Sequence, residues 1–166
     1  MSVCPAQELK ALCLREPVLT LAVAESMTGG RVQAAITAVS GASGYFLGGL
    51  TAYTLDQKVR HLGVKRAAAA KVNAVSSDVA AQMARGAARL FDADVAVATT
   101  GYAEPAPEFG VDDPFAHWAI AHRLAARRWR IVTGRVVCPG MTRTEAQEAV
   151  TATVMVELVA YLHHSA

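Results

Sequence analysis

The chain has 166 residues; 53% are hydrophobic but only 6% are aromatic, and the formal net charge at pH 7 is +2. This length suits a single domain, and the composition predicts a core of alanine, valine and leucine. The balanced charge indicates no nucleic-acid partner, and no apolar run reaches the roughly 18 residues of a membrane-spanning helix. We therefore expect a cytoplasmic protein that binds neither nucleic acid nor membrane.

The three cysteines, Cys4, Cys13 and Cys138, stand at unrelated spacings. They form no CxxC pair, and no histidine lies near them at metal-ligand spacing. Buried or incidental thiols are therefore expected in place of the alternative, a disulfide or a zinc site.

Apolar periodicity and turn residues predict the elements in chain order. The first half contains helices over 5–15, 31–39, 56–62, which Asp56 can cap, and 65–71, with a buried strand over 18–24 and a second strand over 45–53. The second half contains a helix that begins at Ser76 or Ser77, a buried strand over 94–99 and a loop over 102–114. A hairpin over 116–124 and 129–137, with its turn near 125–128, precedes a last helix that begins at Thr142 or Thr144 and ends near 162.

This order of elements predicts one α/β domain over residues 1–166, a three-layer α/β/α sandwich with a mainly parallel, mixed sheet. Ligands of such domains bind at the carboxyl ends of parallel strands. We expect three polar loops to meet there, over 25–30, 40–44 and 100–105. The first of these loops leads from a strand into a helix, an arrangement that directs backbone N–H groups at an anionic ligand.

One pair of residues suggests chemistry without a metal. Serine needs a base to take its proton, and a lysine can be that base when burial lowers its pKa. Ser43 and Lys58 flank one predicted strand and are candidates, with Ser26 as the alternative partner and a solvated Lys58 as the alternative to catalysis. His117 and His122 fall on opposite faces of one predicted strand, which does not favour a metal site or a Ser-His-Asp triad.

Four segments carry a more specific pattern. The run AESMTGG at 24–30 is similar to AESCTGG, and the segment 40–64 resembles GSS-x-x-F…G-x-x-x-Y-x-x-x-x-K-x-x-x-LGV. NAVSSDVAAQMARGA at 73–87 resembles GAVSEEVAxxMAxGA, and TGYAEP at 100–105 resembles TGIAGP. All four patterns are those of the CinA C-terminal domain family, the nicotinamide-mononucleotide amidohydrolases, so the chain resembles that family.

The resemblance implies a homo-oligomeric α/β/α protein that needs no cofactor or metal. Its small-molecule partner would be a nucleotide, nicotinamide mononucleotide, whose carboxamide is hydrolysed to nicotinate mononucleotide and ammonia. Matched position by position, the resemblance implies Ser43 as nucleophile, Lys58 as base and Tyr53 beside them. The implied substrate-binding residues are Ser26, Thr28, Gly29, Gly30, Thr100, Gly101 and Arg143.

The sequence also departs from the family pattern. Met27 replaces a cysteine, Leu55 replaces a polar residue, and Glu104 stands at an expected glycine, where it adds negative charge beside a phosphorylated substrate. Arg143 is displaced by one position, and residues 106–118 do not follow the pattern. Two alternatives are therefore a catalytically inactive or substrate-shifted paralogue that binds a nucleotide or a partner, and an amidase for an unphosphorylated amide.

Overall fold

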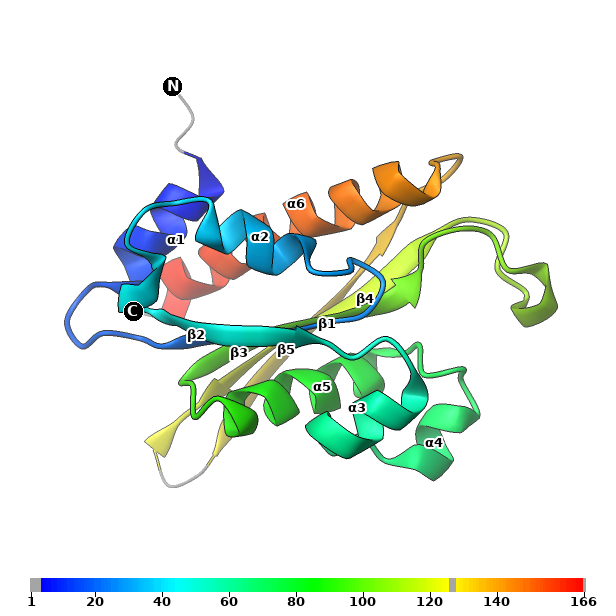
Figure 1. Cartoon of the computed structure of the whole chain (residues 1–166), viewed down its shortest axis with the longest axis horizontal. Coiled ribbons are helices and arrows are strands. Elements are labelled where there is room, and N and C mark those ends of the chain that lie inside the picture. Colours follow the sequence, from blue (N-terminus) through cyan, green and yellow to red (C-terminus); the bar gives the residue numbers. More distant parts are fainter. Residues whose placement is uncertain (1–3, 126–127, 166) are drawn as a thin grey trace.

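A five-stranded mixed sheet forms the centre of the molecule (Figure 1); the computed structural model describes residues 4–125 and 128–165. The strands follow the order β2-β1-β3-β4-β5 across the sheet. β1 is parallel to both β2 and β3, whereas β4 and β5 continue the sheet as an antiparallel hairpin. The bounds are β1 Leu21–Glu25, β2 Phe46–Thr51, β3 Val95–Tyr102, β4 Phe115–Arg123 and β5 Trp129–Val137.

Helices cover both faces of the sheet, as Figure 1 shows. One layer holds α1 (Pro5–Cys13), α2 (Arg31–Thr37) and α6 (Arg143–Ser165). The other holds α3 (Leu55–Leu62), α4 (Arg66–Ala70) and α5 (Ser77–Leu90). The predicted α/β class is confirmed, and so is the predicted hairpin, although residues 126–127 of its turn lie outside the described residues.

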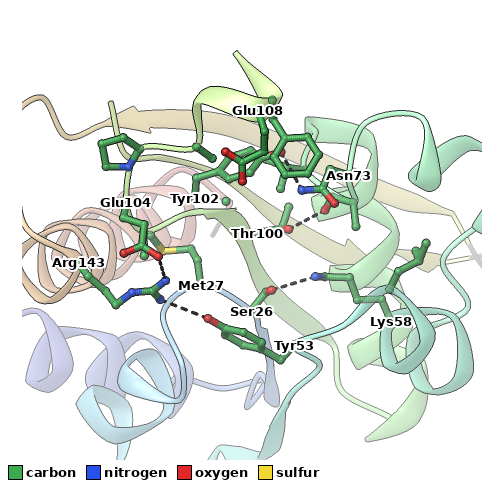
Figure 2. Close-up of a pocket in the computed structure, with 18 residues that line it drawn as sticks. Ser26, Met27, Tyr53, Lys58, Asn73, Thr100, Tyr102, Glu104, Glu108 and Arg143 are labelled. Atoms are coloured by element: carbon green, nitrogen blue, oxygen red, sulfur yellow. Dashed lines mark hydrogen bonds and ion pairs between the residues drawn. The ribbon is translucent and has the colours of Figure 1, made fainter. Parts of the chain in front are cut away.

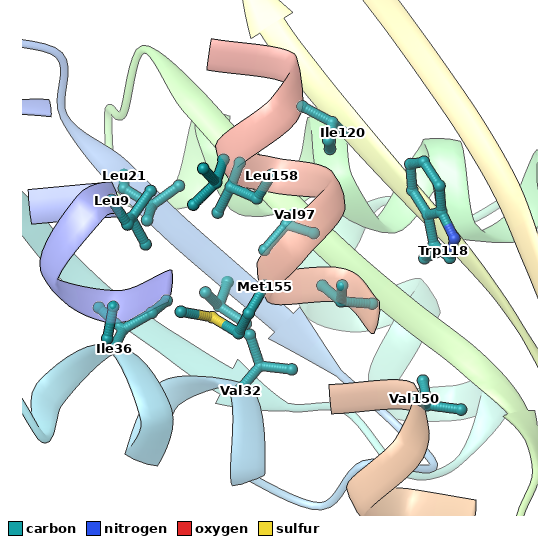
Figure 3. Packing of buried hydrophobic residues seen from close by; sticks show 14 of the residues in the cluster. Leu9, Leu21, Val32, Ile36, Val97, Trp118, Ile120, Val150, Met155 and Leu158 are labelled. Atoms are coloured by element: carbon teal, nitrogen blue, oxygen red, sulfur yellow. The ribbon is translucent and has the colours of Figure 1, made fainter. Parts of the chain in front are cut away.

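The two faces of the sheet have different cores because side chains alternate along each strand. Leu21 and Val23 of β1 pack under α1, α2 and α6 in a core of large aliphatic residues (Figure 3). Ala22 and Ala24 face the other layer, whose core is mostly alanine. These small side chains let α3 and α5 lie close together, and a Cβ built on Gly86 of α5 would come within 2.2 Å of the Leu62 carbonyl oxygen.

The register of β1 and β2 corrects one sequence expectation. Leu21 pairs with Phe46 and Glu25 pairs with Thr51, so both strands run from the same edge of the sheet. The loop over 40–44 precedes β2 and lies at the amino edge, where it ends in the short 3-10 helix Ala42–Gly44. It therefore does not meet the loops at the carboxyl edge.

Local capping follows the sequence only in part. Ser76 caps α5 as predicted, because its hydroxyl accepts the N–H of Val79 at 3.1 Å. α3 is capped by Thr54 and not by Asp56, whose carboxylate pairs with Arg66. Within the described ranges, no helix is long and apolar enough to cross a membrane.

Candidate active site

A cavity of about 330 Å³ lies at the carboxyl edge of β1, β2 and β3 (Figure 2). Its floor is the segment after β1, and one wall is the segment that connects β2 to α3. The other walls come from the turn before α5, the end of β3 with the loop after it, and the start of α6. The cavity therefore brings together residues that are more than 100 positions apart in the chain, Ser26 and Arg143 among them.

Ser26 and Lys58 form a buried pair in this cavity. The Nζ atom of Lys58 lies 2.9 Å from the Oγ atom of Ser26, and only 3% and 6% of the two residues is exposed. Burial lowers the pKa of Lys58 from 10.5 to about 8. No carboxylate among the described residues forms a salt bridge with Lys58, so nothing in that part of the chain offsets this effect.

The predicted pairing of Ser43 with Lys58 is wrong, because Ser26, the alternative partner, contacts the lysine. Ser43 is exposed and lies before β2, whereas Lys58 follows β2, so a whole strand of six residues separates them. At about 3.3 Å per residue, that strand alone keeps them roughly 20 Å apart. The loop that contains Ser43 lies against α1, where Lys10 donates to the Ser40 carbonyl oxygen at 2.8 Å.

The turn after β1 is organised by Glu25, which sequence reasoning did not single out. Its carboxylate is fully buried and lies at the N-terminus of α2. It accepts backbone N–H groups at 2.9 to 3.1 Å and side-chain donors at 2.5 and 3.1 Å, and these donors come from Thr28, Gly30, Val32 and Gln33. The first-turn amides that we expected to face a substrate are therefore satisfied from within the protein.

This arrangement changes the roles of the neighbouring residues. The hydroxyl of Thr28 is fully buried between Glu25 and Thr99, at 2.5 and 2.8 Å. Gly29 and Gly30 have positive φ angles of 62° and 98°, which the tight turn requires, and neither lines the cavity. Of the expected binding turn, only Ser26 and its neighbour Met27 reach the cavity.

Thr100 and Gly101 do line the cavity, but they belong to β3 and not to a loop. They extend the strand because β4 pairs with them, Thr100 opposite His117 and Gly101 opposite Ala116. The Thr100 hydroxyl donates to the Ala74 carbonyl oxygen at 2.8 Å and so stabilises the wall of the cavity. Hydrogen-bonded and non-hydrogen-bonded pairs alternate along an antiparallel ladder, and Gly101 is at a non-hydrogen-bonded position. Its N–H therefore points away from β4, toward the end of β1.

Tyr53 and Arg143 lie at the mouth of the cavity. Arg143 forms an ion pair with Glu104, and it donates to the Tyr53 hydroxyl at 3.4 Å. Figure 2 shows this row of three side chains beside Ser26. The contact with Arg143 lowers the pKa of Glu104, so its carboxylate stays charged. Arg143 thus lies at the site as expected, but its charge is already paired with that of Glu104.

Two further residues that line the cavity, Asn73 and Tyr102, were not predicted from the sequence. Asn73 donates to the Tyr102 hydroxyl at 3.1 Å, and both side chains face the cavity. Asn73 and Ala74 have positive φ angles of 48° and 57°. Asparagine is often found at positive φ, but alanine is not. The turn was therefore not predictable from residue propensities.

The metal-binding capacity of the described part is limited. It contains no group of three or more histidine, cysteine or carboxylate residues placed to hold a metal ion. His117 and His122 project from β4, and the latter contacts the hydroxyl of Tyr161 at 2.9 Å, outside the cavity.

The fold and cavity define a class of α/β/α protein with a buried serine–lysine pair at the carboxyl edge of its parallel strands. A sequence model described as the CinA C-terminal domain matches residues 5–162. The chain belongs to the CinA C-terminal domain family.

Several relatives and solved structures are similar to the chain. A CinA-like protein of Geobacter sulfurreducens is 50% identical over 103 residues, which cover 62% of this chain and 24% of that protein. A putative competence-damage inducible protein of Halothermothrix orenii is 44% identical over 95 residues, 57% of this chain and 22% of that protein. The chain thus spans only about a quarter of the curated relatives that it matches.

Solved structures match over nearly the whole chain. A CinA superfamily protein from Klebsiella pneumoniae has a TM-score of 0.86 at 25% identity and covers 96% of both chains. The competence/damage inducible protein CihA from Agrobacterium tumefaciens has a TM-score of 0.82 at 29% identity, covering 98% of this chain and 99% of that one. These matches confirm the three-layer architecture.

Proposed function

We propose that this protein is an amidohydrolase that hydrolyses the carboxamide of a nicotinamide nucleoside or nucleotide, with Ser26 as nucleophile and Lys58 as base. Nicotinamide mononucleotide is the substrate that the family resemblance implies. The observation that carries the proposal is the 2.9 Å contact between Lys58 Nζ and Ser26 Oγ in a buried site that opens into a cavity.

The base must be neutral before it can accept a proton. With a pKa of about 8, roughly a tenth of Lys58 is neutral at pH 7, whereas an ordinary lysine would be almost fully charged. Neutral Lys58 accepts the Ser26 hydroxyl proton across the contact that it already makes. Tertiary structure therefore supplies the activation that serine lacks in water.

The reaction then proceeds in two halves. Ser26 Oγ attacks the carboxamide carbon while Lys58 takes the hydroxyl proton, and the carbonyl oxygen becomes an oxyanion. The C–N bond breaks as Lys58 returns the proton to the departing nitrogen, which leaves as ammonia and yields an ester on Ser26. Water, deprotonated by Lys58, attacks this ester, and its C–O bond breaks as Lys58 returns the proton to Ser26 Oγ, which releases the carboxylic acid and restores both residues.

The oxyanion needs a donor close to the nucleophile. We assign this role to the N–H of Gly101, because it points toward the end of β1 and Gly101 lines the cavity. A larger residue is not accommodated there, since a Cβ on Gly101 would come within 2.2 Å of the Phe115 carbonyl oxygen. Tyr53 and Arg143, at the mouth, are assigned to substrate positioning.

Ammonia release from nicotinamide mononucleotide and nicotinamide riboside, without added metal, tests the proposal. Ser26→Ala and Lys58→Met should each reduce release by at least about a thousandfold, because each removes a member of the pair. Ser43→Ala is the matched serine control and should retain wild-type release, since Ser43 lies at the opposite edge of the sheet. Full activity in Ser26→Ala, or loss of activity in a folded Ser43→Ala, would contradict the assignment.

A non-catalytic binding protein is the second candidate, and the ion pair between Glu104 and Arg143 favours it because it occupies the arginine expected to bind substrate. Under this alternative, ligands raise the Tm of the wild-type protein while no ammonia is released over hours. Ammonia release that depends on Ser26 would rule it out.

A further inference from the structure

We propose that this site selects a carboxamide borne on a cationic ring and lacking a phosphate group. The inference rests on the proposed hydrolysis for the position of the carboxamide at Ser26, but the selection itself comes from the opposite end of the cavity. Nicotinamide riboside and 1-methylnicotinamide are of this class, and nicotinamide mononucleotide, which adds a phosphate to the riboside, is not.

The charges around the cavity oppose a phosphate. Four charged side chains line it, two basic and two acidic: Lys58, Arg143, Glu104 and Glu108. Lys58 is committed to Ser26, and the guanidinium of Arg143 is committed to Glu104. A phosphate at the mouth would have to displace one carboxylate from Arg143 while facing the other.

Glu108 provides the second negative charge. It is exposed and forms no salt bridge with any residue in the described ranges. Figure 2 places Glu104 and Glu108 on the side of the cavity opposite Tyr53. Apart from Lys58, which is paired with Ser26, the lining carries one positive and two negative charges, so a cationic ligand is favoured at this end.

Aromatic rings lie beside these carboxylates. The rings of Tyr102 and Phe109 have centroids 5.9 Å apart and an interplanar angle of 36°. Phe109 is 54% exposed although it is large and apolar, so a flat ligand ring would remove a sizeable apolar surface from water. Aromatic faces attract cations, and neighbouring carboxylates add to the attraction.

This wall is held in place before a ligand binds. Ala106 and Val111 exchange two backbone hydrogen bonds, of 2.9 and 3.1 Å, which close the loop that carries Glu108 and Phe109. Asn73 holds the Tyr102 hydroxyl at 3.1 Å. The acidic and aromatic groups are therefore preorganised, which lowers the entropic cost of binding a complementary ring.

Calorimetric binding to the Ser26→Ala variant separates recognition from turnover. Nicotinamide riboside should bind at least about tenfold more tightly than nicotinamide mononucleotide, since the two differ only in the phosphate. Adding Glu104→Gln should free Arg143 and tighten nicotinamide mononucleotide by about tenfold while leaving riboside binding unimproved. Glu148→Gln is the control, because it removes the same charge from exposed α6 outside this cavity and should change neither Kd.

Several results would overturn the inference. They are nicotinamide mononucleotide binding as tightly as the riboside, no binding of either compound, or an unchanged preference after Glu104→Gln. The proposed function fails separately, if wild-type protein releases no ammonia from any of the three compounds. In that case a retained binding preference would still support the rejection of a phosphate group at this site.

Discussion

The Oε2 atom of Glu25 lies 3.1 Å from the backbone nitrogen of Val32 and caps α2, the helix that follows the turn containing Ser26. Ser26 is the next residue after Glu25, so the same turn that satisfies the N-terminus of α2 also fixes the position of the serine. The negative charge that a helix N-terminus favours is thus supplied by the chain itself. Recognition of the proposed substrate would therefore come from the walls of the cavity.

Replacing Glu25 should therefore damage both stability and activity. Glu25→Gln keeps the shape but places an amide N–H₂ group among backbone donors, so we expect a loss of about 2–4 kcal/mol in the free energy of unfolding. Urea denaturation measures this loss. Glu148→Gln, on an exposed position, should stay within about 0.5 kcal/mol of wild type, and an equally small change for Glu25→Gln would contradict the capping role.

The rate of hydrolysis should depend on pH through Lys58. Its pKa is lowered to about 8, and only the neutral amine is a base, so kcat should rise about tenfold per pH unit below pH 8 and level off above it. A pH–rate profile between pH 6 and 9.5 checks this expectation. A flat profile over that range, at saturating substrate, would mean that Lys58 is not the titrating base.

Lys58 should also lower the stability of the fold. Its pKa is lower in the folded protein than in the unfolded chain, so at pH 7 the folded state carries a buried charge at a cost. This cost is fully present below about pH 8 and disappears as pH rises toward the unfolded pKa of 10.5. Lys58→Met should raise the Tm at pH 7 by about 2–6 °C while abolishing activity.

The pH dependence of this gain separates it from simple packing. The difference in Tm between Lys58→Met and wild type should shrink as pH rises from 8 to 10.5. A gain in stability that is constant over this range would indicate that the methionine stabilises by hydrophobic contact alone.

Gly86 should control the position of the base from the other side of α3. A Cβ at this position would lie 2.2 Å from the Leu62 carbonyl oxygen, so Gly86→Ala must push α5 away from the end of α3. We expect a loss of about 1–3 kcal/mol in unfolding free energy, despite the better helix propensity of alanine. Activity at a temperature where the variant is folded should also fall, and an unchanged kcat would show that the two helices adjust without moving Lys58.

The sequence predicted the elements better than it predicted the site. The buried strands and the cap at Ser76 were evident because apolar runs and polar caps are local signals. Choosing between Ser26 and Ser43 required the direction of the strands: a serine before β2 lies at the opposite edge from a lysine after it. Parallel pairing of β1 with β2 places Ser26, which follows β1, at the same edge as Lys58.

Other features depend on contacts that no local pattern encodes. Glu104 forms an ion pair with Arg143, which lies 39 positions away in the sequence. The departure of Glu104 from the family pattern indicated an added negative charge but did not identify Arg143 as its partner. The extension of β3 through Thr100 follows from pairing with β4 and not from its own composition. These long-range contacts form the end of the cavity that holds Glu104 and Arg143, which is why that end was the least predictable part.

The segment between β3 and β4 leaves the sheet at Tyr102 and returns at Phe115, two residues that face each other in the ladder. Its two ends are thus fixed as neighbours, while Ser26 and Lys58 come from other elements. The segment can therefore change in length and composition without moving the serine–lysine pair. Under the proposed function, replacement of this one loop would change substrate preference and leave Ser26 and Lys58 in place.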